Sequence, residues 1–441
     1  MLSSQRPRAT VRKAAAAACA AVTALTMAGC GSGGSDDASS SSGDEYSERG
    51  PVTYVAGKDT SGYVQDMLDV WNKKHPDEKV TFIELPTDAD AQRQQMIQNA
   101  ETESDAYSVL SVDVVWNAEF AANRWTEELP ADEFPADEML DPVVETGKYR
   151  DKLYSIPMAS DGGLLYYRTD LLEKAGVDEP PTTWAQMKKD CTKIKKLPEA
   201  KGMDCYAGQF EKYEGLTVNF SEAVNSAGGE IVTDDGKAKI DSPEAKRGLD
   251  FLVESFEDGA IPKKAITFQE EDGRRAFQSG GLIFHRNWPY IYNLASADDG
   301  SSKVAGKFDV APLPGLDGPG TSSLGGHNLA LSAHAKNKAT AVDFMKYFTS
   351  HASAKKRLDI ASIAPPYADL FDDKAMIEQS PYLPELKQSI LKAEPRPRVV
   401  NYGEATRAIQ EQAYAALNGK KSTGQALAAL QKELGKLISA R

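Results

Sequence analysis

Histidine, cysteine and long apolar runs are scarce in this chain, and each scarcity excludes a class of function. Among 441 residues there are five histidines and four cysteines. The histidines are scattered without the spacing of metal ligands, so no metal site and no cofactor are predicted. Nucleophile elbows, zinc-binding helices and phosphate-binding loops are also missing, which leaves the common hydrolase and nucleotide-binding chemistries without a motif.

A single long apolar run, from Ala14 to Ala28, lies near the N-terminus behind four basic residues. At about 15 residues it is shorter than the roughly 20 that a bilayer core needs. Residues 1–29 are therefore predicted to be a secretory signal rather than a membrane span. Residues 30–50, rich in Gly, Ser and Asp, are predicted to form a flexible tether because they cannot bury a core.

Basic residues are outnumbered by acidic ones, and the formal net charge is −14. Such a surface repels phosphate backbones, so nucleic acid is excluded as a partner. The length exceeds what one hydrophobic core usually supports, which favours two lobes.

The positions of the four cysteines predict different roles for them. Cys30 ends the string LTMAGC, which resembles a bacterial lipobox, so it is predicted to carry lipid and hold the protein on the outer face of the cell membrane. The alternative is an ordinary secretory signal that ends beside a cysteine. Cys19 leaves with the signal, and Cys191 and Cys205 are predicted to form a disulfide in the oxidising exterior.

The hydrophobic pattern favours an α/β fold. A β-branched run at 52–56 precedes a helical stripe with Pro76 behind it, and a second strand follows at 80–85. These three segments form a βαβ unit with parallel strands. A nearly continuous apolar strand at 109–115 carries Asp113 near its C-terminal end, the sheet edge at which ligands bind in open parallel sheets. Thr183 and Gln186 have the spacing of a capping box in a second lobe.

Five strings, in order, resemble the extracellular solute-binding proteins of the maltose-binding class, most closely the trehalose/maltose-binding lipoproteins. They are DVVWNAEF at 113–120, SDGGLLYYR at 160–168, NWPY at 287–290, LGGHNL at 324–329 and RPRVVNY at 396–402.

The resemblance implies a type II, two-lobed periplasmic-binding-protein fold with three crossovers, placed near residues 158, 308 and 350. The expected N-lobe is 51–158 plus 309–350, and the expected C-lobe is 159–308 plus 351–441. It also implies a monomer that is not an enzyme: the lobes close over a sugar, such as trehalose, maltose or an oligosaccharide, and deliver it to the permease and ATPase of an ABC importer.

The resemblance also assigns ligand contacts. Trp288 matches a tryptophan that stacks on a sugar ring, with a core tryptophan as the alternative. Asp113 matches an aspartate that accepts from sugar hydroxyls, with a helix cap as the alternative. Asp161 faces the cleft in relatives, although Gly162 and Gly163 beside it are also consistent with a crossover turn.

Further assignments follow the same strings. Arg396 aligns with a ligand-contacting arginine, a role that Arg398 could take over, and Tyr402 ends the string. Gly326 would admit the sugar to the backbone, and His327 occupies a position that is often aromatic in relatives.

Two candidates are less constrained. Trp116 is either core or ligand contact, and Asp59, beside Lys58, is chosen on its position after a strand.

Two other functions remain open. A secreted glycosidase could use Asp113 and Asp161 as acid and base. A protein that binds another polar solute, such as a glycerol-phosphate, would need cations, and only Lys58, Arg396 and Arg398 are available.

Overall fold

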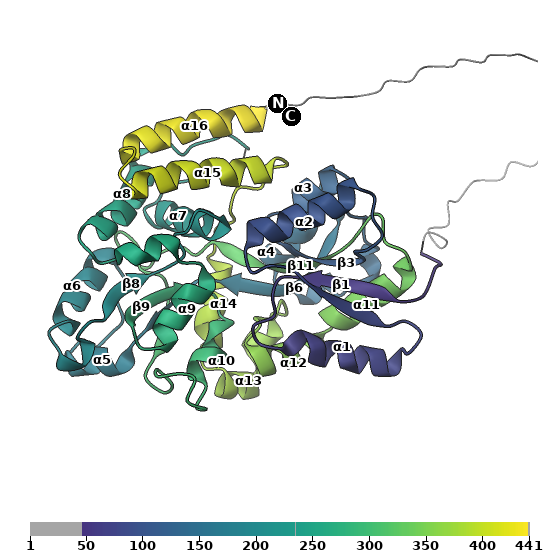
Figure 1. Cartoon of the computed structure of the whole chain (residues 1–441), viewed down its shortest axis with the longest axis horizontal. Helices are drawn as coiled ribbons and strands as arrows, with labels where there is room; N and C mark the ends of the chain where they lie inside the picture. The colour runs from purple at the N-terminus through teal and green to yellow at the C-terminus, as the bar shows by residue number, and fades with distance from the viewer. Residues whose placement is uncertain (1–45, 234, 440–441) are drawn as a thin grey trace, which may run out of the picture. The chain divides into compact units, whose positions relative to one another are not determined.

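The computed structural model describes residues 46–233 and 235–439. The predicted signal at 1–29, Cys30 and the tether up to residue 45 lie outside the described residues. From residue 46 on, the chain builds two α/β lobes, each on its own sheet (Figure 1). Within the described residues no helix has both the length and the apolar character needed to span a bilayer.

The first lobe is built on a five-stranded sheet in the order β2-β1-β3-β11-β6. Its strands are β1 (Val52–Ala56), β2 (Val80–Glu84), β3 (Val109–Asp113), β6 (Ser155–Gly162) and β11 (Leu324–Leu331). Strand β1 pairs in parallel with β2 and β3, whereas β11 runs antiparallel to β3 and β6. The parallel pairing confirms the predicted βαβ unit.

The remaining elements of this lobe are mostly helical. They are α1 (Tyr63–Lys74), α2 (Ala89–Glu101), α3 (Asn117–Ala122), α4 (Asp141–Val144), the small hairpin β4 (Lys148–Tyr149) and β5 (Lys152–Leu153), α11 (Lys338–Thr349) and α12 (His351–Ala361). Helix α1 buries Val64, Met67, Leu68 and Trp71, the stripe seen in the sequence. The Asp88 carboxylate caps α2 by accepting from the Ala91 N–H at 2.8 Å.

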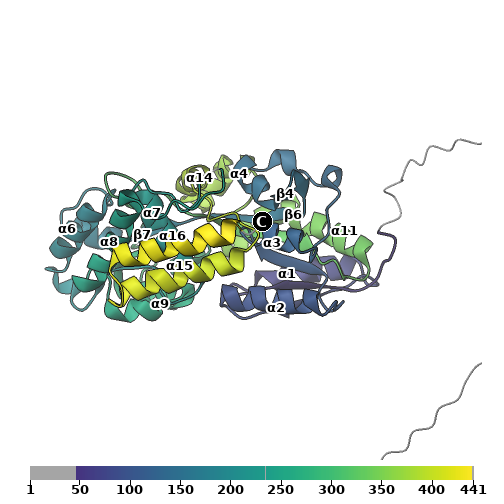
Figure 2. The same ribbon diagram turned by 90° about the horizontal axis from the view of Figure 1, so that it is seen from above.

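The second lobe is built on a four-stranded sheet in the order β10-β7-β9-β8. Its strands are β7 (Leu164–Tyr167), β8 (Asp204–Ala207), β9 (Leu282–Asn287) and β10 (Asp309–Ala311). Its helices are α5 (Thr169–Lys174), α6 (Trp184–Ile194), α7 (Glu214–Ser226), α8 (Pro243–Glu257), α9 (Glu270–Gln278), α10 (Ile291–Ser296), α15 (Tyr402–Leu417) and α16 (Thr423–Ser439). Helices α15 and α16 lie side by side in Figures 1 and 2.

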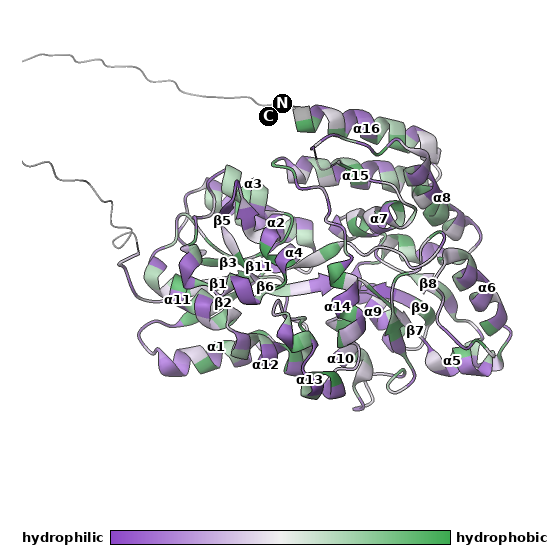
Figure 3. Cartoon of the chain, turned by 180° about the vertical axis from the view of Figure 1, so that it is seen from behind, coloured by the Kyte–Doolittle hydropathy of each residue, from purple (hydrophilic) through white to green (hydrophobic). Residues whose placement is uncertain are grey.

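Surface helices such as α1, α6 and α16 carry both hydrophilic and hydrophobic residues in Figure 3, as expected for helices with one buried face. The six 3-10 turns of the described chain lie at Ala131–Glu133, Ala136–Glu138, Glu145–Gly147, Pro198–Ala200, Lys263–Thr267 and Asp369–Phe371.

Two local predictions, the disulfide and the capping box, concern the second lobe. Cys191 of α6 and Cys205 of β8 form the expected disulfide. Thr183 caps α6 by accepting from the Gln186 N–H, but the Gln186 side chain accepts from the Thr182 N–H, so the predicted reciprocal capping box is shifted by one residue.

The crossovers between the lobes differ from those expected near 158, 308 and 350. Strand β6 continues beyond Pro157 because it pairs with β11 as far as Gly162, and Gly163 alone separates it from β7 in the other sheet. Strand β10 pairs with β7, so the second crossing lies within 312–323. The third lies within 362–401 and includes α13 (Lys374–Gln379) and α14 (Leu383–Leu391). We therefore propose lobe boundaries at these three segments.

Hydrogen bonds join the crossover segments to one another. The Gly163 N–H donates to the Ser322 hydroxyl at 2.6 Å, and the Ser389 hydroxyl donates to the Gly163 carbonyl at 2.9 Å. A Cβ at Gly162 would lie 2.5 Å from the Ser389 oxygen, so glycine is needed for this close approach.

Residues 46–50, assigned to the tether from the sequence, instead lie on the first lobe, and we call them the N-terminal strap. Arg49 pairs with Glu78 and Asp343, each at 2.7 Å, and the Tyr46 hydroxyl donates to the carbonyl of Glu128. The Gly50 N–H donates to Thr340 at 3.2 Å. These bonds were not foreseen because the partners are distant in sequence.

Candidate functional site

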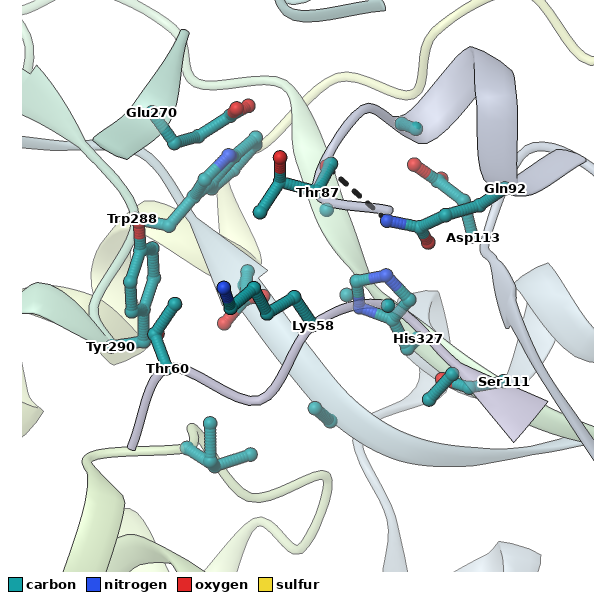
Figure 4. Close-up of a pocket in the computed structure, with 18 of the residues that line it drawn as sticks. Lys58, Thr60, Thr87, Gln92, Ser111, Asp113, Glu270, Trp288, Tyr290 and His327 are labelled. Carbon is teal, nitrogen blue, oxygen red and sulfur yellow. Dashed lines mark hydrogen bonds between the residues drawn. The ribbon is translucent and has the colours of Figure 1, made fainter. Parts of the chain in front are cut away.

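A cavity of about 260 Å³ lies between the lobes (Figure 4). The first lobe contributes the ends of β3, β6 and β11 and the loop after β1, and the second lobe contributes the first turns of α7 and α9 and the segment after β9. The lining combines aromatic rings with charged and amide groups, the combination that fixes a polar ligand in a partly apolar pocket.

Strand β11 brings the predicted first-lobe residues together. His327 pairs with Asp113 of β3, and Gly325 pairs with Asp161 of β6. Gly326 lies between them at φ +115°, and a Cβ there would be 2.3 Å from the Ala159 carbonyl oxygen, so this position requires glycine. All of these residues line the cavity. Burial lowers the pKa of His327, which favours the neutral form of the ring, while the charge of Asp113 opposes this shift.

The Asp161 side chain has no hydrogen-bond or ion-pair partner among the described residues, although it lines the cavity. Burial raises the pKa of its carboxyl to about 7, and the nearby charge of Asp113 adds to the rise while that of Arg286 opposes it. A carboxyl group of this kind is available to accept hydrogen bonds from a ligand.

Trp288 lines the second-lobe wall and remains partly exposed. Its backbone is fixed because its N–H donates to the Asn287 side chain at 2.8 Å and its carbonyl accepts from the Tyr166 hydroxyl at 3.0 Å. A Cβ added to Gly325 would lie 2.8 Å from the indole ring, so the ring packs against the first-lobe backbone. The core alternative for Trp288 therefore does not describe this side chain.

Arg396 joins the two lobes by ion pairs. Its guanidinium donates to Asp113 of the first lobe at 2.7 Å and also pairs with Glu214 at the start of α7. The Tyr402 hydroxyl and the Thr406 hydroxyl donate to the same Glu214 carboxylate. Burial raises the pKa of Glu214, against the lowering effect of the Arg396 cation. Arg398 is exposed and does not line the cavity.

Three more of the predicted site residues make contacts within the protein itself. Trp116 is 1% exposed, does not line the cavity and stacks on Phe120, so it belongs to the core. Tyr402 is fully buried and acts on the site through Glu214 rather than by lining the cavity. Asp59 lines the cavity, but its carboxylate accepts from three backbone N–H groups at the start of α1 and serves as a loop anchor.

Several lining residues from the second lobe were not predicted from the sequence. Glu214 leads the almost wholly buried helix α7, and an acid at the head of an apolar helix was a signal that could have been followed. Glu270 lines the cavity and accepts from the Tyr213 hydroxyl at 2.6 Å. Figure 4 shows Glu270, Trp288 and Tyr290 on one side of the pocket and Asp113, Ser111 and His327 on the other, with Lys58 between them.

The charges of the lining are mainly negative. The acidic members are Asp59, Asp113, Asp161, Glu214, Glu270 and Glu271, against Lys58 and Arg396 as cations. Both ion-pair contacts of Arg396 go to carboxylates of this set, which leaves the Lys58 amine as the one lining cation without a partner in the described chain. No group of three or more His, Cys, Asp or Glu in the described residues is arranged to hold a metal ion.

Comparisons with known proteins agree with this architecture. A model of the family described as bacterial extracellular solute-binding protein matches residues 56–355. A probable ABC transporter-binding protein of Deinococcus radiodurans is 33% identical over 84% of this chain and 89% of its own length. A mannitol-binding protein of Pseudomonas aeruginosa is 25% identical over 83% of this chain and 88% of its own.

Among solved structures, the maltose-bound MalE3 of T. maritima superimposes with a TM-score of 0.83 at 33% identity. The match covers 88% of this chain and 99% of the other. Its similarity over almost the whole folded part confirms the predicted two-lobed, type II α/β fold.

Proposed function

Because the chain belongs to the bacterial extracellular solute-binding proteins, we propose that it captures a neutral sugar between its lobes and delivers it to an ABC importer. The Deinococcus relative, named as an ABC transporter-binding protein, supports the importer, and the maltose-bound T. maritima protein supports the sugar. The proposed ligand is a disaccharide such as trehalose or maltose, or an oligosaccharide, and the proposed state is a monomer.

The proposal rests on two lining residues from opposite walls of the cavity, Trp288 of the second lobe and Asp161 of the first. A sugar ring presents apolar C–H faces and a rim of hydroxyl groups, so it needs a flat aromatic surface and acceptors at the edge. The indole supplies the first and the unpartnered carboxyl supplies the second. Lys58 adds a donor for sugar oxygens.

The alternative ligand, a glycerol-phosphate, is less well supported. A phosphate carries about two negative charges and would have to enter a cavity lined by an excess of carboxylates. Arg396, the strongest candidate cation, already pairs with Asp113 and Glu214. The glycosidase alternative is weakened by the same contact, because both carboxylate oxygens of Asp113 already accept hydrogen bonds from Arg396.

The proposed site of action is the outer face of the cell membrane, through lipid on Cys30. Replacing Cys30 with Ser should move the exported protein from the membrane to the soluble fraction without changing sugar affinity. Retention of the Cys30→Ser protein on membranes would contradict the lipid anchor.

Titration calorimetry of the folded part against maltose, trehalose, mannitol and longer maltooligosaccharides tests the function. We expect at least one sugar to bind, and Trp288→Ala to weaken that binding by roughly 1 to 3 kcal/mol through lost stacking area. Asp132→Asn, a change of an exposed acid away from the cavity, is the control and should leave affinity unchanged. If no sugar of the panel binds, or if Trp288→Ala binds as well as the unchanged protein, the proposal is wrong.

A further inference from the structure

A buried arginine lies against the tryptophan of the cavity. The Arg286 guanidinium carbon is 3.9 Å from the centre of the Trp288 ring, within the range of cation–π contact. Arg286 is 1% exposed and is not part of the cavity lining, whereas Trp288 is. The guanidinium therefore covers the ring face that is turned away from the cavity.

The position of Arg286 is itself fixed. Its Nε donates to Glu222 Oε2 at 2.7 Å while Nη2 donates to the other carboxylate oxygen, so the two planar groups meet in a fork. Its Nη1 donates to the Gln209 side chain at 3.2 Å. Glu222 is 5% exposed, and a bidentate pair in such a place permits little rotation of the guanidinium.

The same ion pair contacts two of the three crossovers. The Ser323 N–H donates to Glu222 Oε1 at 3.1 Å, immediately before β11 begins. A Cβ on Gly163 would lie 2.8 Å from both Arg286 Nη2 and Glu222 Oε1, so the chain crosses between the lobes in contact with the pair. The indole, the ion pair and the crossover backbone thus form one packed unit.

We infer that Arg286, held by Glu222, is a positioning residue that fixes the Trp288 ring for stacking on the ligand and ties it to the crossovers. The ring is confined between the guanidinium behind it and the Gly325 backbone at its edge. A ring that is already ordered loses less conformational entropy when the ligand binds. This inference rests on the proposed function only where it concerns affinity.

The test uses the double variant Glu222→Gln/Arg286→Met, because removing both charges leaves no unpaired ion in the interior. Glu222→Gln keeps an acceptor for Ser323, and Arg286→Lys in the natural background keeps the cation without the planar fork. The matched control is Lys188→Met: Lys188 lies 5.6 Å from the Phe251 ring in the same lobe, away from the cavity.

Fluorine NMR of protein labelled with 5-fluorotryptophan gives a readout that does not need a ligand. The chain has five tryptophans, and the Trp288 resonance is identified by its loss in Trp288→Phe. In the double variant the Trp288 resonance should shift and broaden. Arg286→Lys should cause a smaller change, and Lys188→Met should leave the resonance in place. A folded double variant with an unaltered Trp288 resonance would overturn the inference, and so would Arg286→Lys behaving like the double variant.

Calorimetry with maltose as the probe gives the second readout. We expect the dissociation constant of the double variant to rise about 3- to 10-fold, the effect of one side chain that must be ordered on binding. Unchanged affinity in the double variant would also overturn the inference. If the natural protein binds no sugar, the proposed function fails, while the fluorine spectrum still decides whether Arg286 orders the ring.

Discussion

Each carboxylate of the cavity has a different set of partners, and these partners decide what the group can do. The Asp59 carboxylate accepts hydrogen bonds from backbone N–H groups. Asp113 and Glu214 form ion pairs with Arg396, and Glu271 forms one with Arg274. Asp161 has no such partner in the described chain. It is therefore the carboxyl group whose hydrogen bonds are most available to a ligand, which its residue type alone did not reveal.

The pKa of Asp161 predicts how affinity depends on pH. Burial raises the pKa of this carboxyl to about 7, so the group changes from neutral to charged between pH 6 and 8. The charged form accepts stronger hydrogen bonds from hydroxyl groups, so sugar affinity should increase as the pH rises through 7. Calorimetry at pH 6, 7 and 8 checks this. Asp161→Asn should bind about tenfold more weakly at pH 8 and lose most of the pH dependence.

The same group should make the ligand-free protein less stable at high pH. An acid with a raised pKa binds its proton more tightly when folded than when unfolded. Its contribution to stability therefore falls as pH rises from the ordinary value of 3.8 towards 7, and the loss is complete above about 7. Asp161→Asn should then be more stable than the natural protein at pH 8 in urea unfolding. A less stable variant would show that the carboxylate has a partner of its own.

At the scale of helices and strands, the sequence predicted those elements whose limits are set by interactions within a few residues. Helix α1 follows its apolar stripe, and α2 starts at the Asp88 cap, because spacing and capping act within a few residues. The crossovers that we propose lie later in the chain than the sequence indicated, because the length of β6 and the pairing of β10 depend on partners far away in the chain. The ion pair of Glu214 with Arg396 and the contacts of the strap were missed for the same reason.

The disulfide between α6 and β8 gives a prediction at this scale. Strand β8 is an edge strand of the second sheet, and the bond ties it to a surface helix that does not line the cavity. Replacing Cys191 and Cys205 together with Ala should lower the free energy of unfolding by about 3 kcal/mol. Sugar affinity should not change. Denaturant titration and calorimetry measure the two quantities, and a loss of affinity without a loss of stability would contradict this assignment.

At the scale of the whole fold, polar contacts hold the lobes together around the cavity. Besides Asp113 with Arg396, the Gln269 side chain donates to Asp88 at 3.1 Å and the Gln410 side chain donates to Asp90 at 3.0 Å. Acceptors of the first lobe thus face donors of the second. Lobe closure is stabilised by these bonds as well as by any ligand.

Removing the two glutamine contacts should favour the open form. Each bond contributes about 0.5 to 1.5 kcal/mol, so Gln269→Ala/Gln410→Ala should weaken sugar binding by several-fold. Small-angle X-ray scattering should show a larger radius of gyration for the ligand-free double variant. The control is Gln431→Ala, since Gln431 makes its bonds within the second lobe. An equal effect in the control would mean that stability, not closure, was changed.

The N-terminal strap has a mechanical consequence. Its residues contact the first lobe at separate points: Arg49 pairs with Glu78, in the loop after α1, and with Asp343 of α11, and the Tyr46 hydroxyl donates to the Glu128 carbonyl. If lipid on Cys30 holds the chain end as proposed, the strap makes the first lobe the anchored part of the molecule. Hinge closure would then move the second lobe about the crossovers towards the anchored one.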